Sequence, residues 1–330
     1  MLESSWVGMR VTVRHALDRD DQGRLRLADV VGELLDLDDR RAVIDGRAGI
    51  VEVALDRVVA ARSAPPSTRD QLDLEAIVAR GWRAAETGTV GGWLLRASGG
   101  FTGRANSVLP LGQPGMPLPD ALVRARAWYA ERNLPLRLQL PTEARRLLDA
   151  SVAEQGWAAS PDVHVMVARL DALTGGTADE PPTHPAGNAP AEPVRLSAAP
   201  DQGWLARYRD GAGRSADAWG ILTRHEHVTF AAIRADPDGP VRAIGRGTVN
   251  DGWLGITAVE VDPQLRRAGL AGRILLALAG WGRDQGATRV HVEVSSDNAP
   301  AVALYRSRGF RVHHDYRYRT DPGAMAPPAS

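Results

Sequence analysis

The alternation of apolar and polar positions predicts that the chain begins with a region of short β-strands. Between residues 5 and 62, runs in which every second residue is apolar are separated by the polar stretches "DRDDQG" and "DGRAG". A period of two is typical of half-buried strands, and the acidic residues and glycines between the runs favour tight turns. We therefore predict a small β-barrel over residues 1–64, followed by the stiff linker "SAPPS".

The rest of the chain shows a different pattern, which occurs twice. In residues 70–172, stretches with apolar residues three and four positions apart alternate with short extended runs, and residues 194–322 repeat this order. Trp128 precedes Gly156 by the same interval as that between Trp281 and Gly309. This pattern predicts a duplicated α/β module. Among its helices we expect 269–283, 299–308 and one over 142–157 that Thr142 caps.

Between and after the two modules the pattern disappears. The stretch "TGGTADEPPTHPAGNAPAEP" is rich in Pro, Gly and Ala and has almost nothing to bury. Such a composition is typical of disorder, so we predict a disordered linker over residues 173–193. Residues 323–330 form a short tail.

Composition excludes several kinds of chemistry. The chain has 40 basic and 40 acidic residues, every basic residue is arginine, and there is no cysteine. The absence of lysine excludes a P-loop lysine and Schiff-base chemistry, and the absence of cysteine excludes thiolate nucleophiles and disulfides. A balanced charge and the lack of a long apolar run indicate no nucleic-acid or membrane partner. We expect a soluble cytoplasmic protein.

A loop in the second module has the features of an anion-binding site. In "VEVDPQLRRAGLAGRILLAL", a strand ends before an arginine-rich turn that contains Gly269 and leads into a helix. The first turn of a helix presents free backbone N–H groups at the positive end of the helix dipole, which suits a diphosphate. The alternative is a purely structural turn that happens to contain Arg and Gly.

Two motifs of the second module resemble a known family. Arg266-x-x-Gly269-x-Ala271 fits the Q/R-x-x-G-x-G/A loop of the GCN5-related N-acetyltransferases (GNAT), and "VEVSSDNAPAVALYRSRGF" is similar to their second signature. The whole chain resembles tandem-module actinobacterial members preceded by an SH3-like domain. The resemblance implies tandem GNAT-like modules, acetyl-CoA as acyl donor and N-acetyltransferase activity. Arg267 departs from the pattern, because many members have glycine there.

The resemblance also implies roles for individual residues. The pantetheine arm would hydrogen-bond to the backbone of Val259 and Val261, and Asn298 would contact the cofactor, although it also suits a helix N-cap. Tyr305 would contact the cofactor and act as the acid that protonates the leaving thiolate. The diphosphate would lie on the N–H groups of Arg266, Arg267, Ala268, Gly269, Leu270, Ala271 and Gly272.

The first module lacks these features. Its equivalent loop, "PLGQPGMPLPD", contains prolines where N–H donors are needed, and Val152 stands where the second module has Tyr305. No asparagine matches Asn298. We therefore expect a degenerate module at 70–172 and a catalytic module at 194–322. The sequence "GGFTG" (99–103) indicates a turn rather than a phosphate loop.

Two carboxylates compete for the role of general base. In the strand "VHVEV", Glu293 is on the face opposite to the three valines. The stretch around Glu293 resembles ribosomal-protein N-terminal acetyltransferases. This resemblance implies that Glu293 acts as a base through a water molecule. Glu260 on the neighbouring strand is the rival. His225 and His227 have the spacing of a metal-binding pair, but no third ligand is visible, so we predict no metal.

These features favour acetyl transfer to a primary amine by direct attack in a ternary complex. The alternative is a non-catalytic acyl-CoA sensor or scaffold, in which the SH3-like domain recruits a protein partner. The identity of the acceptor amine does not follow from the sequence.

Overall fold

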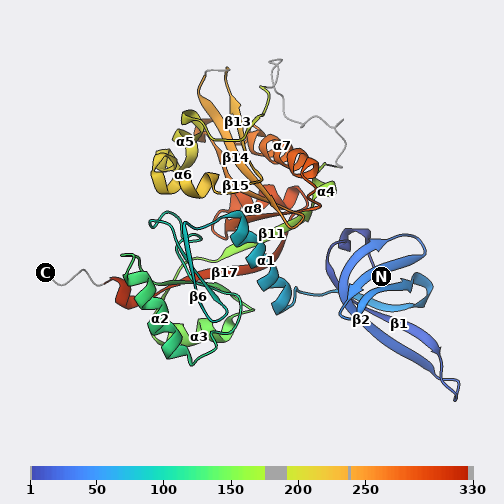
Figure 1. Cartoon of the computed structure of the whole chain (residues 1–330). Helices are drawn as coiled ribbons and strands as arrows, with labels where there is room; N and C mark the ends of the chain where they lie inside the picture. The colour runs from blue at the N-terminus through green and yellow to red at the C-terminus, as the bar shows by residue number, and fades with distance from the viewer. Residues whose placement is uncertain (1, 175–191, 237–238, 326–330) are drawn as a thin grey trace. The chain divides into compact units, whose positions relative to one another are not determined.

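The computed structural model describes residues 2–174, 192–236 and 239–325, and the chain forms two compact units (Figure 1). The first unit is Met1–Ser67 and the second is Thr68–Ser330. Most of the predicted linker, residues 175–191, and residues 326–330 of the predicted tail lie outside the described residues. No helix among the described residues is long and apolar enough to cross a membrane.

The first unit is a small all-β domain. Its strand order is β4-β3-β2-β1-β5, and all neighbouring strands are antiparallel. Alternate residues such as Val11, Val13 and Ile44 form its core, as the period of two predicts. Among the described residues β4 and β5 do not pair, so the sheet does not close into the predicted barrel. The elements are η1 (Ser4–Trp6), β1 (Arg10–Arg19), β2 (Leu25–Leu37), β3 (Arg41–Gly46), β4 (Gly49–Ala54), η2 (Leu55–Arg57) and β5 (Val58–Ser63).

The second unit contains a nine-stranded mixed sheet and a separate three-stranded sheet. The large sheet has the order β10-β17-β11-β16-β15-β14-β13-β12, with β9 also paired to β17, and the small sheet has the order β6-β7-β8. The strands are β6 (Glu86–Val90), β7 (Trp93–Ala97), β8 (Leu109–Pro110), β9 (Arg137–Pro141), β10 (Ala158–Ala159), β11 (Val163–Arg169), β12 (Arg195–Ser197), β13 (Val228–Arg234), β14 (Val241–Asn250), β15 (Trp253–Val261), β16 (Arg289–Ser295) and β17 (Arg311–Thr320).

Helices cover both faces of the sheet formed by β13, β14 and β15 (Figure 1). Helix α7 packs on one face through Ile274, Leu275 and Leu278, while α5, α6 and α1 lie on the other. The helices are α1 (Thr68–Gly81), α2 (Leu118–Ala130), α3 (Arg146–Glu154), α4 (Leu170–Thr174), α5 (Gln202–Arg207), α6 (Ala216–Thr223), α7 (Leu270–Asp284) and α8 (Ala299–Ser307), with the short turns η3 (Tyr208–Arg214), η4 (Pro263–Leu265) and η5 (Pro322–Met325).

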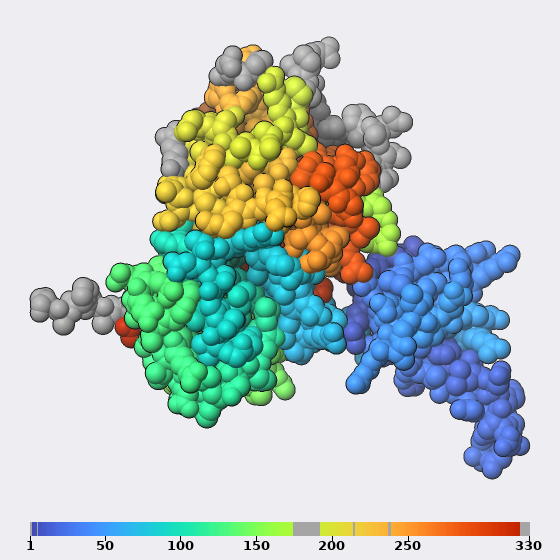
Figure 2. All heavy atoms as spheres, viewed as in Figure 1, coloured from blue at the N-terminus to red at the C-terminus, as the bar shows by residue number. Residues whose placement is uncertain are grey.

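The two predicted modules exchange their last strands. Strand β11 belongs to residues 70–172, yet its partners are β16 and β17, which both belong to residues 194–322. Conversely, β17 pairs with β9, β10 and β11, all from the first half. The space-filling view shows the cyan first half packed directly against the yellow segment of α5 and α6 (Figure 2). The two halves therefore share one sheet.

A buried polar network holds β17 in the first half. The fully buried Glu75 of α1 accepts hydrogen bonds from Gln139 Nε2 of β9 at 2.7 Å and lies 2.9 Å from His314 Nε2 of β17. Gln139 in turn accepts from the buried Arg96 of β7 at 2.9 Å. Such a network is stabilising only when every member has a partner, so it favours this one arrangement of the strands.

The exchange predicts how shortened chains behave. Residues 68–330 should unfold cooperatively without the first unit, because they keep the whole sheet. Residues 194–330 alone should not, since β16 would lose β11 and expose an unpaired edge. Thermal unfolding followed by circular dichroism checks both expectations. Co-expression of 68–172 with 194–330 supplies β11 again and should restore a cooperative transition; a stable 194–330 fragment would contradict the argument.

Candidate active site

Strands β15 and β16 separate halfway along their length. They pair in parallel from Trp253↔Arg289 to Ile256↔Val292, and no described residue pairs with this edge of β15 beyond Ile256. The cause is an irregularity in β15: Ala258 has a left-handed φ of +54°, and the register with β14 shifts there. A bulge of this kind bends a strand away from its neighbour. The edge of β15 at Val259 and Val261 is thus left without a strand partner on the side of β16.

The loop before α7 presents free backbone donors. Gly269 is the N-cap of α7 with φ +78°, no side chain caps the helix, and its first turn carries no acidic residue. Among the described residues, no N–H group from Arg266 to Gly272 donates a hydrogen bond to the protein. Arg266 and Arg267 are exposed beside them. The arrangement provides several N–H donors and positive charge at one helix end, which suits an anion.

The structure explains why the Arg267 position commonly holds glycine. Arg267 adopts a left-handed φ of +64°, a conformation that glycine tolerates and other residues adopt at a cost. At Gly269 a Cβ atom would meet no heavy atom within 4 Å. Glycine is therefore needed at Gly269 for its backbone conformation and not for lack of space within the protein.

Arg308 is a basic residue at this site that the sequence analysis missed. A Cβ atom added to Gly272, in the first turn of α7, would lie 2.4 Å from Arg308 Nη2. The guanidinium of Arg308 therefore covers the start of α7, although the residue follows α8 in the chain. No motif spacing identifies it, because only the packing of α8 against α7 brings it there.

Tyr305 and Asn298 both lie on or next to α8. Tyr305 is 7% exposed and belongs to the same packed cluster as Val292, Leu270 and the partly buried Val259. Burial raises the pKa of Tyr305 to about 12, so its hydroxyl keeps its proton at neutral pH. Asn298 is the N-cap of α8, where its Oδ1 accepts a hydrogen bond from the N–H of Ala301 at 3.3 Å.

The two candidate bases have different surroundings. Glu260 is partly exposed, accepts hydrogen bonds from the N–H of Arg209 at 3.0 and 3.2 Å, and forms no salt bridge with a described residue. Burial raises the pKa of Glu260 above its usual value. The side chain of Glu293 is only 3% exposed, and both of its oxygens already accept hydrogen bonds, from Arg104 at 2.6 Å and from Tyr316 at 2.9 Å.

Arg104 comes from the first half of the chain. Asn106 fixes its loop by accepting from the N–H of Ser98 and donating to the carbonyl of Phe101. Gly103 allows the loop to approach the Tyr318 ring, because a Cβ there would lie 2.8 Å from Cζ. The guanidinium lies 4.6 Å from the centre of the Trp82 ring. The turn "GGFTG" therefore positions Arg104 against Glu293, a function that the sequence analysis did not recognise.

A second arginine lies close to this junction without a carboxylate partner. Arg246 of β14 is fully buried and donates to the carbonyls of Leu222 at 2.8 Å and Gly81 at 3.1 Å. Burial, together with the charge of Arg104, lowers the pKa of Arg246 to about 9. Around Glu293, the junction between the halves thus places two buried arginines near one carboxylate.

Other predicted features have structural explanations. His225 is buried, its Nδ1 accepts from the N–H of His227 at 3.1 Å, and burial lowers the pKa of His225 to about 4. Across the described ranges no three His, Asp or Glu residues gather as metal ligands would. Thr142 is not a helix cap: α3 begins only at Arg146, and Thr142 instead donates to the carbonyl of Asp315.

In the first half, the strands equivalent to β15 and β16 are β8 and β9. They are joined by a single parallel bridge, Val108↔Leu138. Helix α2, the equivalent of α7, begins after Pro117, contains a second proline in its first turn and carries Asp120 there. Prolines provide no N–H, and an acidic residue repels an anion. This helix end therefore has fewer free donors than the start of α7 and is less suited to an anion.

Comparison with known proteins agrees with this geometry. Residues 68–319 match the family model described as "Probable histone acetyltransferase Rv0428c C-terminal", and residues 5–62 match "Rv0428c N-terminal Sm-like domain". The probable histone acetyltransferase Rv0428c of Mycobacterium tuberculosis is 33% identical over 333 residues, which cover 95% of this chain and 96% of that protein. The all-β first unit is thus of the Sm-like, SH3-related type.

Solved structures support the fold. A GCN5-related N-acetyltransferase from Kribbella flavida has a TM-score of 0.55 at 17% identity and covers 76% of this chain and 95% of its own. A tandem GNAT protein from the clavulanic acid biosynthesis pathway has a TM-score of 0.51 at 14% identity, covering 82% and 91%. With the family match, the predicted tandem GNAT fold and the predicted enzyme class are confirmed: the chain belongs to the Rv0428c family and is a tandem-module N-acetyltransferase that uses an acyl-CoA.

Proposed function

We propose that the protein transfers the acetyl group of acetyl-CoA to a primary amine by direct attack in a ternary complex. The observation that carries this proposal is the unpaired edge of β15 next to the donor-rich start of α7. The backbone groups of Val259 and Val261 would bind the amides of the pantetheine arm. The diphosphate would bind the N–H groups of residues 266–272, with Arg266, Arg267 and Arg308 adding positive charge.

Tyr305 is the proposed acid. In the reaction the amine nitrogen attacks the thioester carbonyl, the C–S bond breaks, and the thiolate of CoA needs a proton. Tyr305 remains protonated at neutral pH and lies in the same cluster as Val259, so it is placed to donate that proton.

Glu260 is the proposed base. A base must reach the acceptor ammonium, and Glu260 is partly exposed with a raised pKa and only backbone donors on its oxygens. Glu293 is buried, and an ammonium could approach it only by displacing Arg104 or Tyr316. We therefore assign Glu293 a positioning role that fixes Arg104 at the wall of the acceptor site.

The acceptor site would be formed by residues of both halves. Near Glu260, Arg209, Asp210 and Gly211 have three consecutive left-handed conformations, and the Arg209 guanidinium lies 5.8 Å from the ring centre of Phe101 of the first half. Strained backbone of this kind is concentrated at functional sites. We propose that this segment and the Arg104 loop together select the amine.

The first prediction of this proposal concerns the loop before α7. Replacing Gly269 by alanine should weaken acetyl-CoA binding by about 10-fold. Alanine disfavours the left-handed conformation by roughly 1–2 kcal/mol, so the free loop would leave the conformation that presents its N–H groups and binding would have to restore it. Isothermal titration calorimetry measures the change. Gly280→Ala, inside α7 where a Cβ would meet nothing within 4 Å, is the matched control and should bind normally. Equal affinities of the two variants would exclude this loop as the diphosphate site.

Tyr305→Phe tests the acid. The variant keeps the ring and its packing but removes the proton donor, so kcat should fall by roughly 10²–10⁴-fold while the affinity for acetyl-CoA changes little. Steady-state CoA release with a good acceptor amine, together with calorimetry, gives both quantities. A loss of binding without a specific loss of kcat would indicate only a packing role.

The pH profile distinguishes the two carboxylates. A base is active only when ionised, so kcat/KM should rise with pH through the raised pKa of Glu260 and become constant above it. Glu260→Gln should lower the rate and remove this limb. Glu293→Gln should lower the rate but keep the limb, with a reduced Tm because Arg104 loses its partner. If Glu293→Gln alone removes the limb, the two assignments must be reversed.

A further inference from the structure

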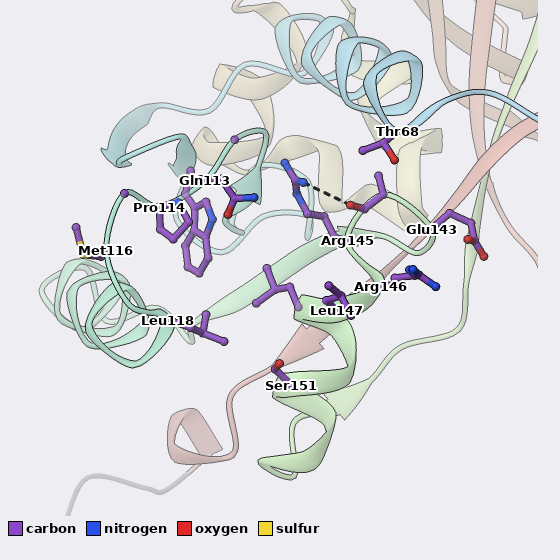
Figure 3. A pocket seen from close by; sticks show the side chains of 15 residues that line it. Thr68, Gln113, Pro114, Met116, Leu118, Glu143, Arg145, Arg146, Leu147 and Ser151 are labelled. Atoms are coloured by element: carbon purple, nitrogen blue, oxygen red, sulfur yellow. Dashed lines mark hydrogen bonds between the residues drawn. The ribbon is translucent and has the colours of Figure 1, made fainter. Parts of the chain in front are cut away.

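The first half contains a cavity at the place where the second half has its acyl-CoA loop. Its volume is about 600 Å³, within the range of roughly 300–1,000 Å³ typical of small-molecule sites. The loop 112–118 before α2 forms one side, and the start of α3 forms the other (Figure 3). The residues that line the cavity are therefore all different from the residues proposed to bind acetyl-CoA, which belong to the second half of the unit.

Most of the cavity wall is apolar. Trp93 lines it and is buried, and Met116, Leu118 and Leu148 are partly buried against the same core cluster. Leu147, at the start of α3, is 75% exposed and lines the same cavity. An occupant with an apolar body would cover these side chains.

Two arginines line this wall, Arg145 and Arg146, and Arg145 has no carboxylate partner among the described residues. Arg145 Nε donates to the carbonyl of Pro110 at 2.6 Å and Nη1 to that of Ala144 at 3.4 Å, and no described carboxylate lies within salt-bridge distance. Burial lowers the pKa of Arg145, and no acidic neighbour offsets the effect. Figure 3 shows its guanidinium directed toward Gln113, whereas Glu143 and Arg146, both exposed, lie on the other side of the α3 start.

The cavity offers a diphosphate fewer backbone donors than the start of α7 does. Pro114 and Pro117 have no N–H, the N–H of Gly112 already donates to Gly92, and Asp120 adds a negative charge at the start of α2. A single guanidinium suits an anion with one charge, because one arginine forms a two-point contact with one carboxylate.

We propose that this cavity binds a small monocarboxylate with an apolar body. The carboxylate pairs with Arg145, and the body packs on Trp93, Met116, Leu118 and Leu148. The proposal is independent of the acetyl-transfer assignment, because it uses none of the residues around β15 and α7.

Octanoate is a suitable probe, with 1-octanol as the uncharged control. The full-length protein, saturated with acetyl-CoA, should bind octanoate in calorimetry and bind octanol more weakly. Arg145→Gln should reduce octanoate affinity by about 10- to 100-fold, whereas Arg124→Gln, at an exposed arginine of α2, should leave it unchanged. Met116→Trp, which fills the cavity and keeps Arg145, should also abolish binding.

Each outcome decides the question. Displacement of octanoate by acetyl-CoA would place the probe in the second half and overturn the proposal. So would equal affinity of the wild-type protein and Arg145→Gln, or no binding by the wild type at millimolar octanoate. If Arg145→Gln fails to fold, as judged by its thermal transition, then retained binding by Met116→Trp would overturn the proposal and lost binding would support it.

Discussion

The hydrogen bonds between β11 and β16 are the constraint on which the second unit depends. They run along the whole of β16, from Val163↔Ser295 to Arg169↔Arg289. Because β16 is fixed on this side by a strand of the first half, the departure of β15 after Ile256 opens the sheet only between β15 and β16. The proposed acyl-CoA position in the second half therefore requires a strand from the first half, even though no residue of β11 is proposed to touch the substrate.

Buried charges at the junction between the halves support the proposal that the first half contributes to the acceptor site. Burying a carboxylate and a guanidinium is costly, and such pairs are often less stable than apolar packing. Glu293, Arg104 and Tyr316 nevertheless form a connected set next to the end of β16, and a second cation, Arg246, is buried nearby without an acid. Because burying these charges costs free energy, the cluster of Glu293, Arg104 and Tyr316 favours a positioning role. Through Arg104, the first half would contribute to the proposed acceptor site.

Local patterns in the sequence predicted the elements well, because each depends on neighbouring residues. Strand β16 contains the predicted stretch "VHVEV", α7 is displaced by one residue at each end from the predicted 269–283, and α8 ends one residue before the predicted 308. Three features depend on contacts between distant residues and left no local signal: the exchange of β11 and β17, the bulge at Ala258 and the approach of Arg104 to Glu293. The barrel was predicted closed because alternation reveals strands but not which edges pair. The roles of Tyr305, Glu260 and Glu293 remain predictions.

The two halves show how a duplicated fold can change the anion that it suits. At α7 the donors are backbone N–H groups, which are arranged together at one helix end and match the several oxygens of a diphosphate. At α2 prolines reduce the number of such donors, and of the two arginines that line the cavity, Arg145 on the opposite wall is directed toward the loop at Gln113. A side chain has a single charge and one preferred geometry. If both proposals hold, fewer backbone donors and a nearby arginine shift the preference of the module from a diphosphate toward a single carboxylate.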